Sequence, residues 1–328
     1  MNKMNKKVIA VITAIMLLAT CLTGCGGGGD KAADPARISF ASGGTSGTYY
    51  PIAGAISTLW TDKVEGLTVD VQSTGASAEN LNLINKGEAE VALVQNDVMY
   101  YAYTATESFA GVDKNESFLT LGTVYPEVVQ LVVAGDAGIE TLADLKGKAV
   151  SIGDVGSGVE SNAKQILAAA GIGLDEITVR NLGFGESANG IKDKTLDAAF
   201  VTAGTPTTAV TELAATNDIK VLSLDQAVID QLCADYGYYT EFVIPADVYG
   251  TAADAKTVAV KATIVVKADL SEGLVYNMTK ALFENLDVVA ESHAKGKELS
   301  LKGAVDGVSV PLHPGAAKYY AEQGLDVE

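Results

Sequence analysis

The feature that most constrains the fold is a unit that occurs four times along the chain. Each unit is a short apolar stretch typical of a strand, then a turn rich in Gly, Ser and Thr, then a run with apolar residues at helical spacing. The four turns lie at residues 42–51, 73–77, 153–158 and 202–206. Because strands that alternate with helices form mainly parallel sheets, the sequence predicts an α/β fold.

The first of these turns indicates what the unit can do. Ile38 and Phe40 alternate with polar residues before the turn, and Pro51 suits the first turn of the following helix. Glycine lets the backbone approach a ligand closely, and the helix N-terminus favours an anion by roughly 0.3–1 kcal/mol. We interpret the turn as one wall of a small-molecule site. The alternative is a connection that needs glycine only for its geometry.

A buried strand at residues 91–94 ends in polar residues that extend this candidate site. Ligands of open α/β sheets bind beyond the carboxyl ends of the strands, where Gln95 and Asn96 lie. The alternative for Asn96 is an N-cap of the next helix. The predicted ligand-binding residues are Gly44, Thr45, Ser46, Thr48, Tyr49, Ser73, Thr74, Gly75, Ala76, Ser77, Gln95, Asn96, Gly156, Ser157, Gly158, Ser161, Thr202, Ala203, Gly204 and Thr205.

Two α/β blocks follow one another along the chain and indicate a two-lobed protein. Stretches near residues 124–133 and 240–266 are expected to cross between the lobes. The first lobe would comprise residues 37–126, the second lobe residues 127–246, and residues 247–328 would return to the first. We expect a monomer whose lobes close on a ligand that contacts turns from both.

The N-terminus has the pattern of an export signal. Three lysines within the first seven residues precede an apolar run at residues 8–22, which is short for a bilayer span. The tetrapeptide Leu22-Thr-Gly-Cys25 resembles the bacterial lipobox, in which the cysteine is lipidated. We therefore expect a lipoprotein signal peptide at residues 1–24 and a lipidated Cys25. A flexible tether at residues 25–36 would hold the body outside the membrane, in the cell envelope. A transmembrane anchor is the alternative.

Charge and cysteine content exclude several classes of partner and bond. The formal net charge is −18, which argues against nucleic acid because its binding depends on basic surface. Arg37 and Arg180 are the only arginines, so we expect an anion to be held by hydroxyls and helix N-termini rather than by guanidinium groups. Of the three cysteines, Cys21 would leave with the signal peptide and Cys25 would carry lipid. Cys233 would remain alone, without a disulfide partner.

No catalytic or metal-binding constellation is recognisable in the sequence. His293 and His313 are the only histidines, and neither has a partner at metal-ligand spacing. Glu127 and Glu160 would form a carboxylate pair only if the lobes brought them together. A surface or hinge role is expected for Glu127, and a position in the first turn of a helix for Glu160. We therefore expect a binding protein without a cofactor rather than an enzyme.

Five motifs resemble those of the TAXI subfamily of TRAP-transporter solute-binding proteins, in the same order along the chain. The first is Gly-Gly-Thr-Ser-Gly-Thr-Tyr-Tyr-Pro, and the five lie at residues 43–51, 72–80, 125–130, 200–206 and 310–315. The resemblance covers residues 38–325, essentially the whole mature chain. It implies a two-lobed periplasmic-binding-protein-like fold of type II, with two crossing strands and a ligand cleft.

The resemblance also implies a partner and a class of ligand. The partner would be an ion-driven TRAP permease in the membrane, and the ligand a small carboxylate or amino acid such as glutamate or glutamine. Ser46 and Ala53 stand where glycine is more usual in the family, which leaves the identity of the ligand open. The alternative is that the chain is the ligand-binding subunit of an ATP-driven importer, or of a sensor with the same fold.

Overall fold

The computed structural model describes residue 34 and residues 36–327. The predicted signal peptide at residues 1–24, the lipidation at Cys25 and most of the predicted tether at residues 25–36 lie outside the described residues. Residues 36–327 belong to one compact unit. None of the helices described there is both long and apolar enough to cross a membrane.

Helices and strands alternate along most of the chain. The strands are β1 (Arg37–Ala41), β2 (Thr68–Gln72), β3 (Val91–Gln95), β4 (Phe118–Ala134), β5 (Ala149–Ser151), β6 (Thr178–Arg180), β7 (Ala198–Ala203), β8 (Ile219–Leu222), β9 (Thr240–Ile244) and β10 (Ala255–Lys267). The α-helices are α2 (Tyr49–Lys63), α3 (Ser77–Lys86), α4 (Asn96–Thr104), α5 (Gly158–Ala169), α6 (Phe184–Lys192), α7 (Thr208–Ala214), α8 (Gln226–Asp235), α9 (Glu272–Phe283), α10 (Leu286–Ser292) and α11 (Pro314–Glu322).

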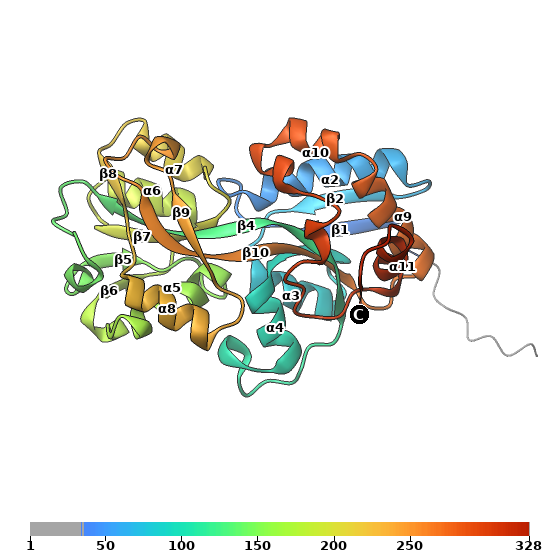
Figure 1. Cartoon of the computed structure of the whole chain (residues 1–328), viewed down its shortest axis with the longest axis horizontal. Helices are drawn as coiled ribbons and strands as arrows, with labels where there is room; N and C mark the ends of the chain where they lie inside the picture. The colour runs from blue at the N-terminus through green and yellow to red at the C-terminus, as the bar shows by residue number, and fades with distance from the viewer. Residues whose placement is uncertain (1–33, 35, 328) are drawn as a thin grey trace, which may run out of the picture. The chain divides into compact units, whose positions relative to one another are not determined.

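All ten strands join one mixed sheet, with the main order β2-β1-β3-β10-β4-β7-β5-β6. Strand β1 is parallel to β2 and β3, and β5 is parallel to β6 and β7. Strand β10 is antiparallel to both β3 and β4, and β4 is antiparallel to β7. In Figure 1, β4 and β10 run through the middle and connect a first block, containing β1–β3, with a second block, containing β5–β8. The α/β prediction is confirmed, and so are the two crossing strands.

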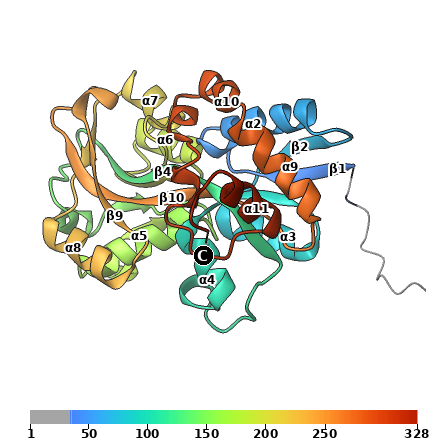
Figure 2. The same ribbon diagram turned by 45° about the vertical axis from the view of Figure 1, so that its right-hand side comes forward.

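Each block has its own hydrophobic core. In the first block Phe40 stacks on Trp60 with ring centroids 5.7 Å apart, and Trp60 Nε1 donates to the carbonyl of Met278 at 2.8 Å. Helices α2, α9 and α11 cover this core (Figure 2). In the second block Phe200 packs with Ile166 and other side chains of α5 and α8. Burial of one such Phe or Ile side chain stabilises the fold by roughly 1.5–3 kcal/mol.

Local sequence signals place several boundaries correctly. Gly87 ends α3 in the left-handed region at φ 73°, and the Ser271 hydroxyl accepts from the N–H of Leu274 at the start of α9. Helix α9 ends at Phe283, and the separate helix α10 begins at Leu286.

Both predicted crossing stretches differ in extent from the strands. The stretch predicted near residues 124–133 is part of a longer strand, because β4 continues through Pro126 over 17 residues. Its pairing with β10 is irregular beside this position, where a proline without an N–H is tolerated. In the predicted stretch 240–266, β9 pairs with the beginning of β10, so β10 alone crosses between the blocks.

Candidate functional site

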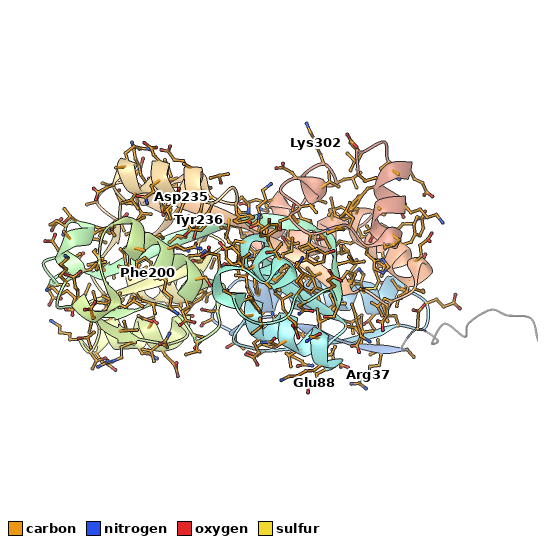
Figure 3. The ribbon with its side chains drawn as sticks, turned by 90° about the horizontal axis from the view of Figure 1, so that it is seen from below. Arg37, Glu88, Phe200, Asp235, Tyr236 and Lys302 are labelled. Atoms are coloured by element: carbon orange, nitrogen blue, oxygen red, sulfur yellow. The ribbon has the colours of Figure 1, made fainter. Side chains whose placement is uncertain are left out.

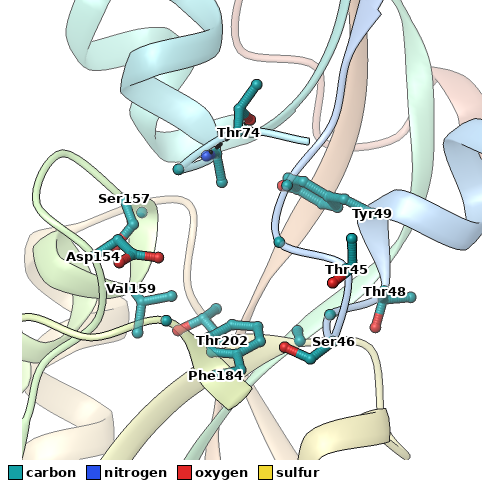
Figure 4. A pocket seen from close by; sticks show the side chains of 18 of the residues that line it. Thr45, Ser46, Thr48, Tyr49, Thr74, Asp154, Ser157, Val159, Phe184 and Thr202 are labelled. Atoms are coloured by element: carbon teal, nitrogen blue, oxygen red, sulfur yellow. Dashed lines mark hydrogen bonds between the residues drawn. The ribbon is translucent and has the colours of Figure 1, made fainter. Parts of the chain in front are cut away.

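A cavity of about 450 Å³ lies where turns of the first block face turns of the second (Figure 4). Its lining comprises residues 43–49, 73–77, 157–159 and 183–186 together with Gln95, Glu127, Asp154, Asn189, Thr202 and Ala203. A volume of this size suits one small molecule.

The first wall of the cavity is built from the turns before α2 and α3. The two turns are tied together by the hydroxyl of Ser73, which donates to the Gly43 carbonyl at 3.0 Å, and by that of Thr74, which donates to the Ser42 carbonyl at 3.1 Å. The buried amide of Asn80 also donates to the Ser42 carbonyl, at 2.7 Å. These bonds fix the backbone, so the hydroxyls and N–H groups of this wall are held in place.

The second wall is built from the ends of β5 and β7 and the starts of α5 and α6. Ser157 caps α5 by accepting from the N–H of Glu160 at 3.1 Å. Phe184 begins α6 and lies near the first wall, since a Cβ added to Gly47 would lie 3.3 Å from its ring. This wall therefore combines an aromatic face with a capped helix N-terminus.

The two blocks are in contact around the cavity. Hydrogen bonds between them beside the cavity include those from Ala78 N to Gly156 O (3.1 Å), from Ala209 N to Ser46 O (3.3 Å), and from Thr48 Oγ1 to Gly204 O (3.4 Å). The cavity is thus bordered by both blocks, as expected for a protein that holds its ligand between two lobes.

Most of the predicted ligand-binding residues come together in this one cavity. Those in its lining are Gly44, Thr45, Ser46, Thr48, Tyr49, Ser73, Thr74, Gly75, Ala76, Ser77, Gln95, Ser157, Gly158, Thr202 and Ala203. They are distant in sequence and are united by the carboxyl ends of β1, β2, β3 and β7. Their contact with a ligand stays a prediction.

Five predicted residues lie outside the lining, namely Asn96, Gly156, Ser161, Gly204 and Thr205. The Asn96 side chain is occupied by the backbone, because Oδ1 accepts from the N–H of Lys261 at 2.9 Å and Nδ2 donates to Gly307 at 3.3 Å. Gly156 and Ser161 line a separate groove beside the cavity. They lie at the α5 N-terminus, but on the side turned away from the cavity.

The sequence interpretation missed the charged part of the lining. Glu127, expected at a surface or hinge, is only 2% exposed and accepts a hydrogen bond from the Tyr49 hydroxyl at 2.7 Å. Asp154 and Glu186 add two further carboxyl groups. The motif at residues 125–130 contains Glu127 and is a usable signal for it, whereas none of the five motifs includes residues 183–189.

Burial is the main influence on the pKa values of the ionisable groups in the cavity, whose described lining contains no lysine or arginine. Burial is the main cause that raises the pKa of Glu127 to about 8, and the negative charge of Asp97 adds to it. Burial also raises the pKa of Tyr49, with the Glu127 carboxyl next in importance. The pKa of Asp154 is raised by burial and then by the neighbouring Glu186.

Neither arginine contributes to the cavity. Arg37 lies at the outer edge of the molecule (Figure 3) and pairs with Asp70, with 2.9 Å between Nη2 and Oδ1. Arg180 is exposed, and its Nη1 donates to the carbonyl of Val179. The described lining contains no lysine or arginine, so its positive potential comes from N–H groups and a helix N-terminus alone.

The comparisons with known proteins identify a family and a fold. Residues 40–324 match the NMT1-like family. PhnD1 from Prochlorococcus marinus, solved in complex with methylphosphonate, has a TM-score of 0.54 and 10% identity, with 81% of this chain and 92% of that chain covered. A binding protein component of an ABC phosphonate transporter from Pseudomonas aeruginosa has a TM-score of 0.51 and 13% identity, covering 82% and 80%.

A third similar structure is the alkanesulfonate-binding protein SsuA from Xanthomonas axonopodis pv. citri, bound to MOPS. Its TM-score is 0.50 at 15% identity, with 89% of this chain and 92% of that chain covered. At these identities the likeness shows the fold and not the ligand. The chain belongs to the NMT1-like family and has the type II fold of periplasmic solute-binding proteins.

Proposed function

We propose that this protein binds a small polar solute in the cavity and delivers it to an importer in the membrane. The observation that carries the proposal is the cavity between the two blocks, whose walls come from both and carry polar groups on turns. Export through the signal peptide and anchoring through a lipidated Cys25 belong to the same proposal. The division into lobes at residues 37–126, 127–246 and 247–328 gives the parts that close on the solute.

Binding without catalysis fits the chemistry of the described residues. His313 lies near the carbonyl of Leu270 and accepts from the N–H of Gly315, and His293 accepts from the N–H of Lys295. Neither histidine lines the cavity. No group of three His, Cys, Asp or Glu side chains among the described residues is arranged to hold a metal ion.

We propose an ATP-driven importer as the membrane partner. One of the similar structures is a component of an ABC transporter, and the family match does not specify TAXI proteins. The ion-driven TRAP permease is the second candidate, and the five sequence motifs favour it. Uptake in membrane vesicles distinguishes the two, since ATP depletion would stop the first and dissipation of the ion gradient the second.

A cavity-filling substitution tests the proposed binding site. Gly44 lines the cavity and a Cβ there meets nothing within 4 Å, so Gly44→Leu adds bulk at the cavity wall without a clash at its Cβ. Gly54→Leu is the matched control, because its Cβ is equally free but lies on α2 outside the cavity. Mass spectrometry of solutes released from gently purified protein should recover the ligand from the parent and the control, and not from Gly44→Leu. Equal recovery from both variants would place the site elsewhere.

A further inference from the structure

The inner end of the cavity contains buried polar atoms without a partner. Gln95 is 3% exposed and Thr202 is 4% exposed, yet neither Gln95 Oε1 nor Thr202 Oγ1 has a hydrogen-bond partner among the described residues. Both side chains line the cavity. An unpaired buried polar atom costs roughly 1–3 kcal/mol, so these two atoms point to a ligand group that satisfies them.

Strand register places Glu127 between these two residues. Gln95 is opposite Ala262 of β10, and Glu127 is opposite Val260, two residues along the same strand. Thr202 is opposite Val129, which is two residues from Glu127 on β4. Because side chains two residues apart lie on the same face of a strand, all three project from one face of the sheet.

Gly158 leaves space for the Gln95 side chain. A Cβ at this position would lie 2.0 Å from Gln95 Oε1, so glycine is needed for the Gln95 amide to lie against the first turn of α5. Tyr49 holds one Glu127 oxygen through its 2.7 Å hydrogen bond. The carboxyl of Glu127 is thereby oriented while it remains part of the cavity lining.

The three groups together suit a donor with several N–H bonds. Gln95 Oε1 only accepts, an ionised Glu127 only accepts, and the Thr202 hydroxyl accepts as well as donates. A carboxylate ligand has no proton for Gln95 and would add negative charge beside Glu127. A protonated primary amine offers three N–H donors and one positive charge, which matches all three groups.

The charges around Glu127 leave it without a cation of its own. Asp97 on α4 adds negative charge, and the phenols of Tyr49 and Tyr125 complete its titratable surroundings. The two lysines on the elements beside this region have other partners, since Lys261 pairs with Asp306 and Lys295 pairs with Glu298.

We infer that the inner end of the cavity is the subsite for a protonated primary amine of the solute, held by Glu127, Gln95 and Thr202. The inference rests on the proposed solute-binding function and names its ligand class, an amine or amino acid rather than a bare carboxylate. The rest of the solute lies toward the hydroxyls and N–H groups of the first wall, where a carboxylate of an amino acid finds donors.

Amine binding is coupled to a proton. With its pKa raised to about 8, Glu127 is mostly neutral at pH 7 in the free protein and must lose its proton to pair with an ammonium group. Binding at pH 7 therefore releases close to one proton. Affinity rises about tenfold per pH unit up to about pH 8, because less free energy is then needed to ionise Glu127.

Calorimetry with matched probes tests this inference. The probes are the common L-amino acids, each compared with the 2-hydroxy acid that carries the same side chain, in two buffers of different ionisation enthalpy. We expect at least one amino acid to bind about 100-fold or more tightly than its hydroxy analogue and to release close to one proton. Glu127→Gln should weaken that binding about 100-fold and abolish proton release, whereas Glu212→Gln, at an exposed position on α7 outside the lining, should leave affinity and proton release unchanged.

The results separate this inference from the proposed function. Equal binding of an amino acid and its hydroxy analogue, or unchanged affinity in Glu127→Gln, would overturn the amine subsite. The amine subsite would also be overturned if no amino acid bound, while the purified protein retained a solute without an amine and lost that solute in Gly44→Leu. In that last case solute binding would stand and only the ligand class would be wrong.

Discussion

Two buried carboxyl groups, Glu127 and Asp97, show how differently this protein treats negative charge in its interior. Asp97 is 0% exposed at the start of α4, and its Oδ2 accepts from Asn162 Nδ2 of α5 at 2.9 Å. Asn162 also belongs to a hydrogen-bonded network across the two blocks whose other members are Tyr239, Gln165 and Tyr101. Glu127 is 2% exposed but lines the cavity, and Tyr49 is its hydrogen-bonded neighbour.

The difference lies in what opposes the cost of burial. Burial raises the pKa of both groups, to about 6 for Asp97 and to about 8 for Glu127. For Asp97, hydrogen bonds from the backbone at the start of α4 and from Asn162 stabilise the charged form. Glu127 accepts hydrogen bonds from fewer donors, and the negative charge of Asp97 further disfavours its ionised form. The first carboxyl joins α4 to α5 through its Oδ2, although its Oδ1 has no partner among the described residues, whereas the second lines the cavity proposed for the ligand.

Removing the partner of Asp97 should give the largest loss of stability. Asn162→Leu keeps a similar volume but leaves a buried carboxyl without its side-chain donor, so we expect the free energy of unfolding to fall by about 3 kcal/mol at pH 7. Urea unfolding measures this loss. Asn82→Leu, on the exposed face of α3, is the control and should change stability little. Equal losses in the two variants would refute the structural role of the Asp97 network.

Neutralising Glu127 should change stability in the opposite direction. Its pKa of about 8 in the folded protein lies above the ordinary 4.5, so between these values the folded state holds a proton that the unfolded state has lost. Stability therefore falls as pH rises through this window. Glu127→Gln should stabilise the ligand-free protein by about 4 kcal/mol at pH 8 and by less than about 0.5 kcal/mol at pH 4.5. A pH-independent effect, or a loss of stability at pH 8, would contradict this account of Glu127.

The smallest effect is expected for solute binding in Asp97→Asn. Asp97 does not line the cavity, but its charge helps to raise the pKa of Glu127. Without that charge more of Glu127 is ionised at pH 7, so an amine-bearing solute should bind up to about threefold more tightly. Calorimetry at pH 7 and pH 9 checks this, since the gain should vanish at pH 9. A loss of binding comparable to that of Glu127→Gln would place Asp97 in the site itself.

The first wall of the cavity could be predicted because local sequence determines it. Each turn follows directly after an apolar strand and precedes a helix, so residues 43–49 and 73–77 are placed at the carboxyl ends of their strands by chain connectivity alone. The α/β class and the two crossing strands follow from the same alternation. Within α5, the same reasoning could not tell the face of Ser157 from that of Ser161.

The charged part of the cavity depends on pairings that the sequence does not reveal. Glu127 faces the cavity because β4 continues through Pro126 and pairs with β10, more than a hundred residues later in the chain. A one-residue shift in that register would turn Glu127 to the other face of the sheet. Phe184 and Asn189 join the lining only because the second block is packed against the first.

A crystal structure of the protein with its solute retained would test the central claim most directly. We predict that the solute occupies the cavity between the two blocks, with an amine nitrogen about 2.7–3.2 Å from Glu127, Gln95 Oε1 and Thr202 Oγ1. Its remaining polar groups should face residues 43–49 and 73–77. A solute bound outside this cavity, or one that presents a carboxylate to Glu127, would contradict the account.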